Sequence, residues 1–99
     1  MRVRVTSDAL QDVQDSHDFY DRQEQGLGSY FRRCIEQDLQ SLRTTAGIHS
    51  QIHGYLHVNS KIFHSIFYYR MEQQTAVVMA ILDARIDPSA RDRVLEQRG

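Results

Sequence analysis

The chain has 99 residues, of which 40% are hydrophobic and 25% are charged, and its formal net charge at pH 7 is −1. This length supports one domain, residues 1–99, because a chain of this size buries roughly two thirds of its unfolded surface in a single core. The composition excludes a disordered chain, a coiled coil and a disulfide scaffold. The near-neutral charge provides no overall attraction to nucleic acid or to an anionic membrane.

Cysteine usage and hydropathy indicate the compartment. The lone cysteine, Cys34, cannot form an internal disulfide and falls on the apolar stripe of a predicted helix, so we expect a buried thiol. No apolar run reaches the length of a membrane span, and the first residues lack the apolar segment of a signal peptide. These features predict a cytoplasmic protein that contacts no membrane.

The first half of the chain predicts a strand followed by two helices. Residues 2–6 alternate charged and apolar side chains, which favours a short strand at the side of a sheet. Thr6, Ser7 and Asp8 offer helix N-caps, and apolar residues then recur at helical spacing to about Gln23. After a glycine-containing link, a second apolar stripe with a period near 3.6 predicts a helix to about Thr45. We expect the two helices to form an antiparallel pair that covers a sheet.

The second half predicts three strands and a short helix. Residues 51–59 favour a strand, and residues 62–71 and 76–87 favour a hairpin because two runs rich in β-branched and aromatic residues flank four polar ones. Asp87 and Pro88 favour a helix start, and the helix to about Gln97 has few apolar residues, so we expect weak docking. The predicted class is α+β, an antiparallel sheet packed against an N-terminal helical hairpin, with the order β-α-α-β-β-β-α.

The first hairpin strand has two different faces. One face is expected to point into the core and carries Phe63, Ser65, Phe67, Tyr69 and Met71. The other face mixes apolar with polar and charged side chains and carries Ile62, His64, Ile66, Tyr68 and Arg70. The mixed face is therefore where we expect functional residues.

Four short motifs follow one another along the chain. They are Phe19-Tyr20, Gly26-Leu27-Gly28-Ser29-Tyr30-Phe31, Ile66-Phe67-Tyr68-Tyr69-Arg70 and Ala80-Ile81-Leu82-Asp83-Ala84-Arg85-Ile86-Asp87-Pro88. In this order and spacing they resemble the RelE/ParE family of bacterial type II toxins, and the resemblance covers nearly the whole chain. Asp83 and Ile86 depart from the family pattern, since many members have a histidine and a second arginine there.

The resemblance implies the toxin of a type II toxin–antitoxin module, a growth inhibitor linked to plasmid stabilisation. It implies a cognate antitoxin as the partner, DNA gyrase or the ribosome as the target, no cofactor and no sequence-specific DNA binding, and it is compatible with a homodimer. Members of the ParE branch inhibit gyrase without catalytic residues of their own. Members of the RelE branch are ribosome-dependent mRNA endoribonucleases.

RelE-type cleavage would need an acid, a base and cations around the reacting phosphate. The candidates for these catalytic roles are Lys61, His64, Tyr68, Arg70 and Arg85. RelE-like members carry lysines in the preceding strand, where this chain has His53, Tyr55 and His57. Because cations are depleted, the ParE-like inhibitor is the preferred prediction and the endoribonuclease is the alternative.

For the predicted partner-binding residues, a purely structural role is the alternative to a role in binding. The resemblance implies antitoxin contacts by aromatic and basic side chains, here Tyr30, Phe31, Tyr68, Arg70 and Arg85. The aromatic residues would otherwise belong to the core, and the arginines would pair with Asp83, Asp87 or Glu72. No metal site is predicted, because His53 and His57 on one strand face would lie about 13 Å apart.

Overall fold

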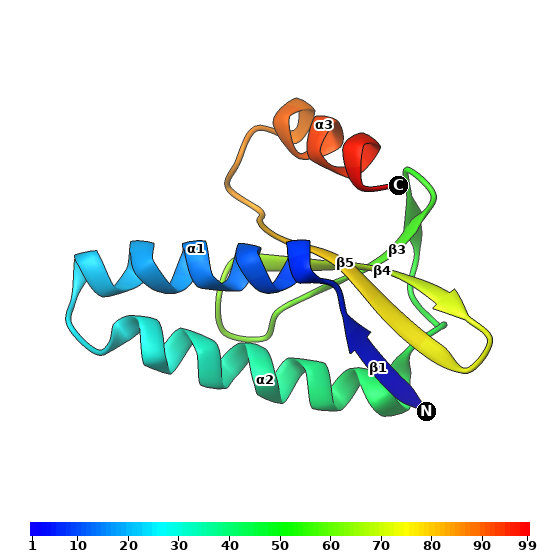
Figure 1. Cartoon of the computed structure of the whole chain (residues 1–99), viewed down its shortest axis with the longest axis horizontal. Helices are drawn as coiled ribbons and strands as arrows, with labels where there is room; N and C mark the ends of the chain where they lie inside the picture. Colours follow the sequence, from blue (N-terminus) through cyan, green and yellow to red (C-terminus); the bar gives the residue numbers. More distant parts are fainter.

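A helical hairpin lies on one face of a five-stranded sheet and a third helix lies on the other, in a computed structural model that describes residues 1–99 (Figure 1). The helices are α1 (Ser7–Gln23), α2 (Leu27–Thr45) and α3 (Pro88–Arg98). The strands are β1 (Arg2–Val5), β2 (Gln51–Ile52), β3 (Tyr55–Asn59), β4 (Ser65–Glu72) and β5 (Thr75–Asp83). The predicted α+β class and helical hairpin are confirmed. No helix combines the length and the apolar character that crossing a membrane requires.

The sheet has the order β1-β5-β4-β3-β2 and differs from the prediction in two respects. First, β1 lies at the edge, as expected, but runs parallel to β5, whereas all other pairs are antiparallel. Second, the strand predicted over residues 51–59 is broken into β2 and β3. His53 and Gly54 both have positive φ angles, 50° and 79°, which is the conformation of a two-residue hairpin turn.

Local capping explains why the helices begin where they do. The Thr6 hydroxyl accepts a hydrogen bond of 3.2 Å from the Ala9 N–H at the start of α1. The Asp87 carboxylate accepts one of 3.0 Å from the Ser89 N–H at the start of α3, and Pro88 occupies the first turn. Both caps were predicted from the sequence.

Gly28 permits the close approach of the two hairpin helices. A Cβ atom there would lie 2.4 Å from the main-chain oxygen of His17 on α1, well inside van der Waals contact. The Gly28 N–H also donates a hydrogen bond of 2.9 Å to the Asp21 carboxylate. The two helices are therefore joined tightly next to the loop that connects them.

Replacing Gly28 by alanine is expected to lower the free energy of unfolding by about 1–3 kcal/mol, because α1 and α2 must separate to admit the methyl group. Urea unfolding followed by circular dichroism measures this loss. Ser29→Ala is the control: Ser29 is exposed on the same helical turn, so its change should stay within about 0.5 kcal/mol. Equal losses in both variants would contradict the steric explanation.

The sheet separates two cores. The larger core joins α1 and α2 to the inner sheet face through Phe31, Ile35, Phe67, Tyr69 and Val78, among others. The smaller core lies under α3 and contains Tyr55, Ile66, Tyr68, Ala80, Leu82 and Leu95. Alternating residues of β4 point into different cores, which confirms the predicted alternation. The expectation that the second face is a functional surface is wrong for Ile66 and Tyr68, because both are buried under α3.

The expectation that the C-terminal helix docks weakly is wrong. Leu95 is fully buried, and the Tyr55 hydroxyl donates a hydrogen bond of 3.0 Å to its main-chain oxygen. The Arg98 guanidinium on α3 also forms an ion pair with Asp12 on α1. Few apolar residues therefore suffice, because polar contacts hold both the middle and the end of α3.

Candidate functional site

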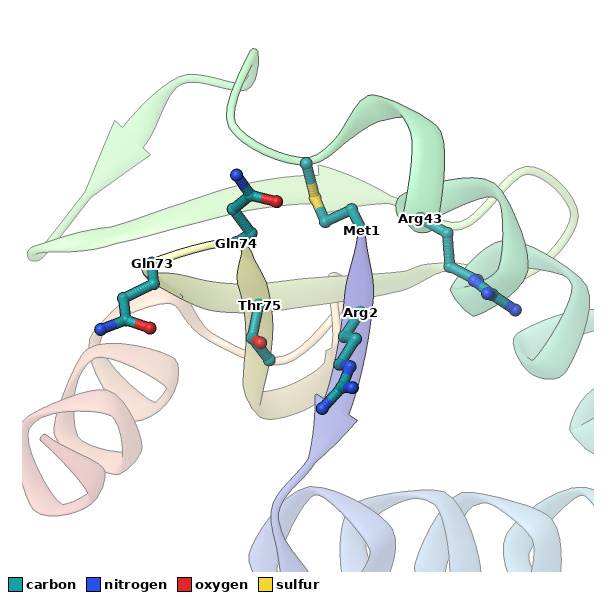
Figure 2. Close-up of a pocket in the computed structure, with 6 residues that line it drawn as sticks. All are labelled: Met1, Arg2, Arg43, Gln73, Gln74 and Thr75. Atoms are coloured by element: carbon teal, nitrogen blue, oxygen red, sulfur yellow. The ribbon is translucent and has the colours of Figure 1, made fainter.

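A continuous groove runs along the free edge of β1. Its three successive hollows have volumes of about 660, 410 and 330 Å³. The first two share Arg2 and Arg43, and the last two share Val5 and Leu39. Figure 2 shows the first hollow, between Arg2 on β1, Arg43 on α2 and Gln73 and Gln74 at the β4–β5 turn. We call these three hollows the β1 groove.

The β1 groove has an apolar floor and a basic rim. Its apolar lining is Val3, Val5, Leu10, Val13, Ile35 and Leu39. Its charged lining is Arg2, Arg32, Arg43 and Glu36, so basic side chains outnumber acidic ones by three to one. The chain's arginine ion pairs involve Arg4, Arg85 and Arg98, so none of the groove arginines is paired with a carboxylate. The groove therefore suits an acidic partner with apolar side chains.

The main chain of β1 adds hydrogen-bonding groups to this groove. The N–H groups of Arg2 and Thr6 donate to Gln74 and Val78 at the β5 side, over 3.3 and 3.1 Å. Because direction alternates along a strand, the polar groups of Val3 and Val5 point toward the open edge. An exposed strand edge of this kind can pair with an added strand.

The five predicted catalytic residues do not come together in one site. His64 lies beside the end of β5, where its main-chain oxygen accepts a hydrogen bond of 2.7 Å from the Ala84 N–H, next to Arg85. Arg70 pairs with Val77 toward the other end of β4, about 17 Å from Ser65 at 3.3 Å per residue. Lys61 approaches α2 instead, with its Nζ 3.4 Å from the Ser41 hydroxyl. The set offers no common position for a phosphate.

Two of the residues predicted to contact a partner are buried. Phe31 has no exposed surface in the larger core, and Tyr68 is only 3% exposed under α3. In this conformation neither side chain is available to a partner, since both contribute to packing. Tyr30 is exposed and stacks its ring under the Arg33 guanidinium, 5.9 Å from the centroid.

The two arginines on the predicted list have different partners. Arg85 donates to both carboxylate oxygens of Asp83, over 3.0 and 2.7 Å, and to the Tyr20 hydroxyl over 3.2 Å. The ion pairing considered as the alternative is therefore present at Arg85, and these hydrogen bonds hold the pKa of Asp83 below its usual range. Arg70 does not pair with Glu72. Its guanidinium donates a hydrogen bond of 3.3 Å to the Gly99 oxygen and lies 4.6 Å from the centre of the Tyr55 ring.

Sequence reasoning missed a contact between His49 and Tyr69. The Tyr69 hydroxyl, at the end of a fully buried side chain, accepts a hydrogen bond of 2.9 Å from the Gly47 N–H and lies within hydrogen-bond distance of His49 Nδ1. Partial burial lowers the pKa of His49, and the nearby His57 lowers it further. The neutral imidazole is therefore the form that the folded chain prefers.

Stability is expected to fall as the pH is lowered from about 7.5 to about 5.5, because the unfolded chain, with a histidine pKa near 6.5, binds a proton more readily than folded His49. His49→Gln removes this titration and should flatten the dependence. The measurement is the urea midpoint as a function of pH. His64→Gln, at an exposed histidine, is the matched control, and an unchanged slope in His49→Gln would contradict the assignment.

The histidines do not build a metal centre. No three His, Cys, Asp or Glu side chains gather into a group that could hold a metal ion. His53 instead lies 2.9 Å from the Asp92 carboxylate on α3, which ties the β2–β3 turn to that helix.

Comparison with known proteins finds similarity among solved structures. No protein-family profile and no curated protein matches this sequence. A solved chain described as "Chromosomal ParDE TA system from P. aeruginosa" is similar in structure, with a TM-score of 0.77 and 16% sequence identity over 86% of this chain and 97% of that chain. The chain has a ParE-like fold. The predicted resemblance is thus confirmed in the architecture.

Proposed function

We propose that the chain is the toxin of a type II toxin–antitoxin module and that the β1 groove binds the antitoxin. The observation that carries this proposal is a basic, apolar-floored groove along a free strand edge in a ParE-like fold. A flexible segment with acidic and apolar residues would find arginines for its carboxylates and a floor for its apolar side chains. The chain's similarity to a chain of a ParDE system supports the same pairing.

The groove replaces the antitoxin contacts predicted from motifs as the main binding surface. Phe31 and Tyr68 are buried, and Tyr30, Arg70 and Arg85 do not line the groove. The exposed members of that set are then secondary contacts, available to a segment that extends beyond the groove. Binding by a helix in the groove and binding by an added strand both fit its length and its open edge.

Between the two activities, we propose inhibition of DNA gyrase. The scattered positions of His64, Arg70 and Lys61 argue against a nuclease, because general acid–base catalysis needs its groups within hydrogen-bond reach of the reacting atoms. Arg85 is also occupied by Asp83, which reduces its availability to a phosphate. An inhibitor that acts through surface contact has no such requirement.

Induction of the chain alone in bacteria tests this proposal. Growth, plasmid supercoiling and protein synthesis are followed together, with and without the product of the adjacent gene, where an antitoxin is expected. Growth arrest with early loss of negative supercoiling supports the gyrase inhibitor, and rescue by the neighbouring product supports the module. Early arrest of translation with cut messages would favour the endoribonuclease. Unchanged growth in all cases would overturn the toxin proposal.

A further inference from the structure

A second apolar surface lies on the other side of α1. Phe19 on α1 and Ile86 in the loop after β5 line a hollow of about 430 Å³, and each side chain is 45% exposed. Behind them, the Tyr20 ring packs against the rings of Phe31 and Phe63, with centroids 5.0 and 4.9 Å apart. We call Phe19, Ile86 and the hollow between them the Phe19 patch. Exposed large apolar side chains on a rigid base are typical of protein interfaces.

The charge of the Phe19 patch is opposite to that of the β1 groove. Arg85 is the one base that lines the hollow, and Asp83 binds it through two hydrogen bonds. Asp15 forms no ion pair. Its carboxylate instead accepts a hydrogen bond of 2.9 Å from the neutral Gln11 amide. The hollow therefore keeps the negative charge of Asp15, which disfavours a phosphate backbone or an acidic segment.

The two surfaces are also separated by the geometry of α1. Leu10 lines the β1 groove and Phe19 lines the patch. They are nine residues apart, which is two and a half turns at 3.6 residues per turn, so they lie on opposite faces of the helix. A segment bound in the groove leaves the Phe19 patch open.

We infer that the Phe19 patch is the surface through which the chain contacts its protein target, an inference that rests on the proposed function as a toxin. The target segment that complements this patch has one apolar side chain, which inserts between Phe19 and Ile86. A lysine or arginine of the same segment pairs with Asp15. The antitoxin and the target thus bind on different sides of α1, the antitoxin in the basic β1 groove and the target on the acidic Phe19 patch.

Three variants induced alone in bacteria test the inference. Phe19→Ala/Ile86→Ala removes the apolar contacts, and Asp15→Lys reverses the charge without changing them. Ile48→Ala/Ile52→Ala is the matched control, because it removes two exposed isoleucines, 79% and 41% exposed, outside both surfaces. We expect colony counts after induction to rise at least tenfold over wild type for the first two variants and to be unchanged for the control. Thermal midpoints close to that of wild type show that all variants fold.

Four results would overturn the inference. The first is killing by the patch variants at the wild-type level. The second is an equal loss of killing in the control. The third is a loss of binding between the purified patch variants and the product of the adjacent gene, which would make the patch an antitoxin surface. The fourth is a sedimentation experiment in which the wild type is a dimer and the patch variants are monomers, which would make the patch a dimer interface. If induction of the wild-type chain has no effect on growth, the proposed function as a toxin is overturned, and the assignment of the target surface fails with it.

Discussion

Replacing Arg98 by alanine is expected to lower the free energy of unfolding by about 3 kcal/mol, because it leaves the partly buried carboxylate of Asp12 without its cation. The Arg98 guanidinium donates to both Asp12 oxygens and, over 3.2 Å, to the main-chain oxygen of Met79. The Asp12 carboxylate also accepts a hydrogen bond of 2.9 Å from the Ile81 N–H. The Asp12 hydrogen bonds raise the pKa of Arg98, so the arginine stays charged at every pH of interest.

The position of this ion pair explains its large expected contribution to the free energy of unfolding. β1 ends at Val5, opposite Val78, so the following residues of β5 have no strand on that side. A bulge also interrupts the pairing of β5 with β4, since Tyr68 pairs with Ala80 but Tyr69 pairs with Val78. Asp12 and Arg98 therefore satisfy the main-chain groups that the shortened edge leaves open. Their loss would expose unpaired polar groups as well as separate α1 from α3.

Urea unfolding of matched variants measures this contribution. Arg4→Ala is the control, because Arg4 and Glu72 form a 3.5 Å pair with side chains 59% and 60% exposed, worth less than about 1 kcal/mol. Asp12→Asn keeps an acceptor for the Ile81 N–H but loses the charge, so its loss should fall between the two. A loss in Arg98→Ala no larger than in Arg4→Ala would show that the pair is not structural.

The elements of this fold were predictable where their signals are local. Thr6, Asp87 and Pro88 act within a few residues of the helix starts that they define, so the chain alone indicates them. The alternation of Phe67 and Tyr69 with Ile66 and Tyr68 likewise predicts two faces of one strand.

Pairings between distant residues were not predictable in this way. The parallel alignment of β1 with β5 joins residues more than 70 positions apart, and nothing near residues 2–5 indicates its direction. The firm docking of α3 depends on Tyr55, Asp12 and Arg98, whose contacts span 40 and 86 positions. Counting apolar residues in the last helix therefore underestimated how well it is held.

The candidate site shows the same difference between what local sequence signals predict and what contacts between distant residues determine. The motifs of the family resemblance identified the fold, but the predicted catalytic residues in and near them lie apart. Arg70 pairs with Val77, Arg85 follows the opposite end of β5, and Lys61 approaches α2. The basic side chains of the β1 groove are Arg2 on β1 and Arg32 and Arg43 on α2, and none of them belongs to the four motifs. The available signal was the edge position of residues 2–6, which would have directed attention to the arginines beside them.

Reversing two charges of the β1 groove, Arg2→Glu with Arg43→Glu, is expected to weaken antitoxin binding by about 100-fold, since each attraction to an acidic segment becomes a repulsion. Both side chains are exposed and neither forms an ion pair, so the fold should be unaffected. Titration of the purified variant with the product of the adjacent gene measures the effect. In cells, the same variant should still arrest growth but resist rescue.

The control must carry the same change in net charge. Arg22→Glu with Arg93→Glu meets this need, because both arginines are exposed and lie outside the groove. If long-range attraction alone guided binding, both double variants would weaken it equally, and added salt would remove the difference from wild type. A loss confined to the groove variant would instead require close contact of the acidic segment with Arg2 and Arg43. Equal affinity of wild type and the groove variant would mean that the antitoxin binds elsewhere.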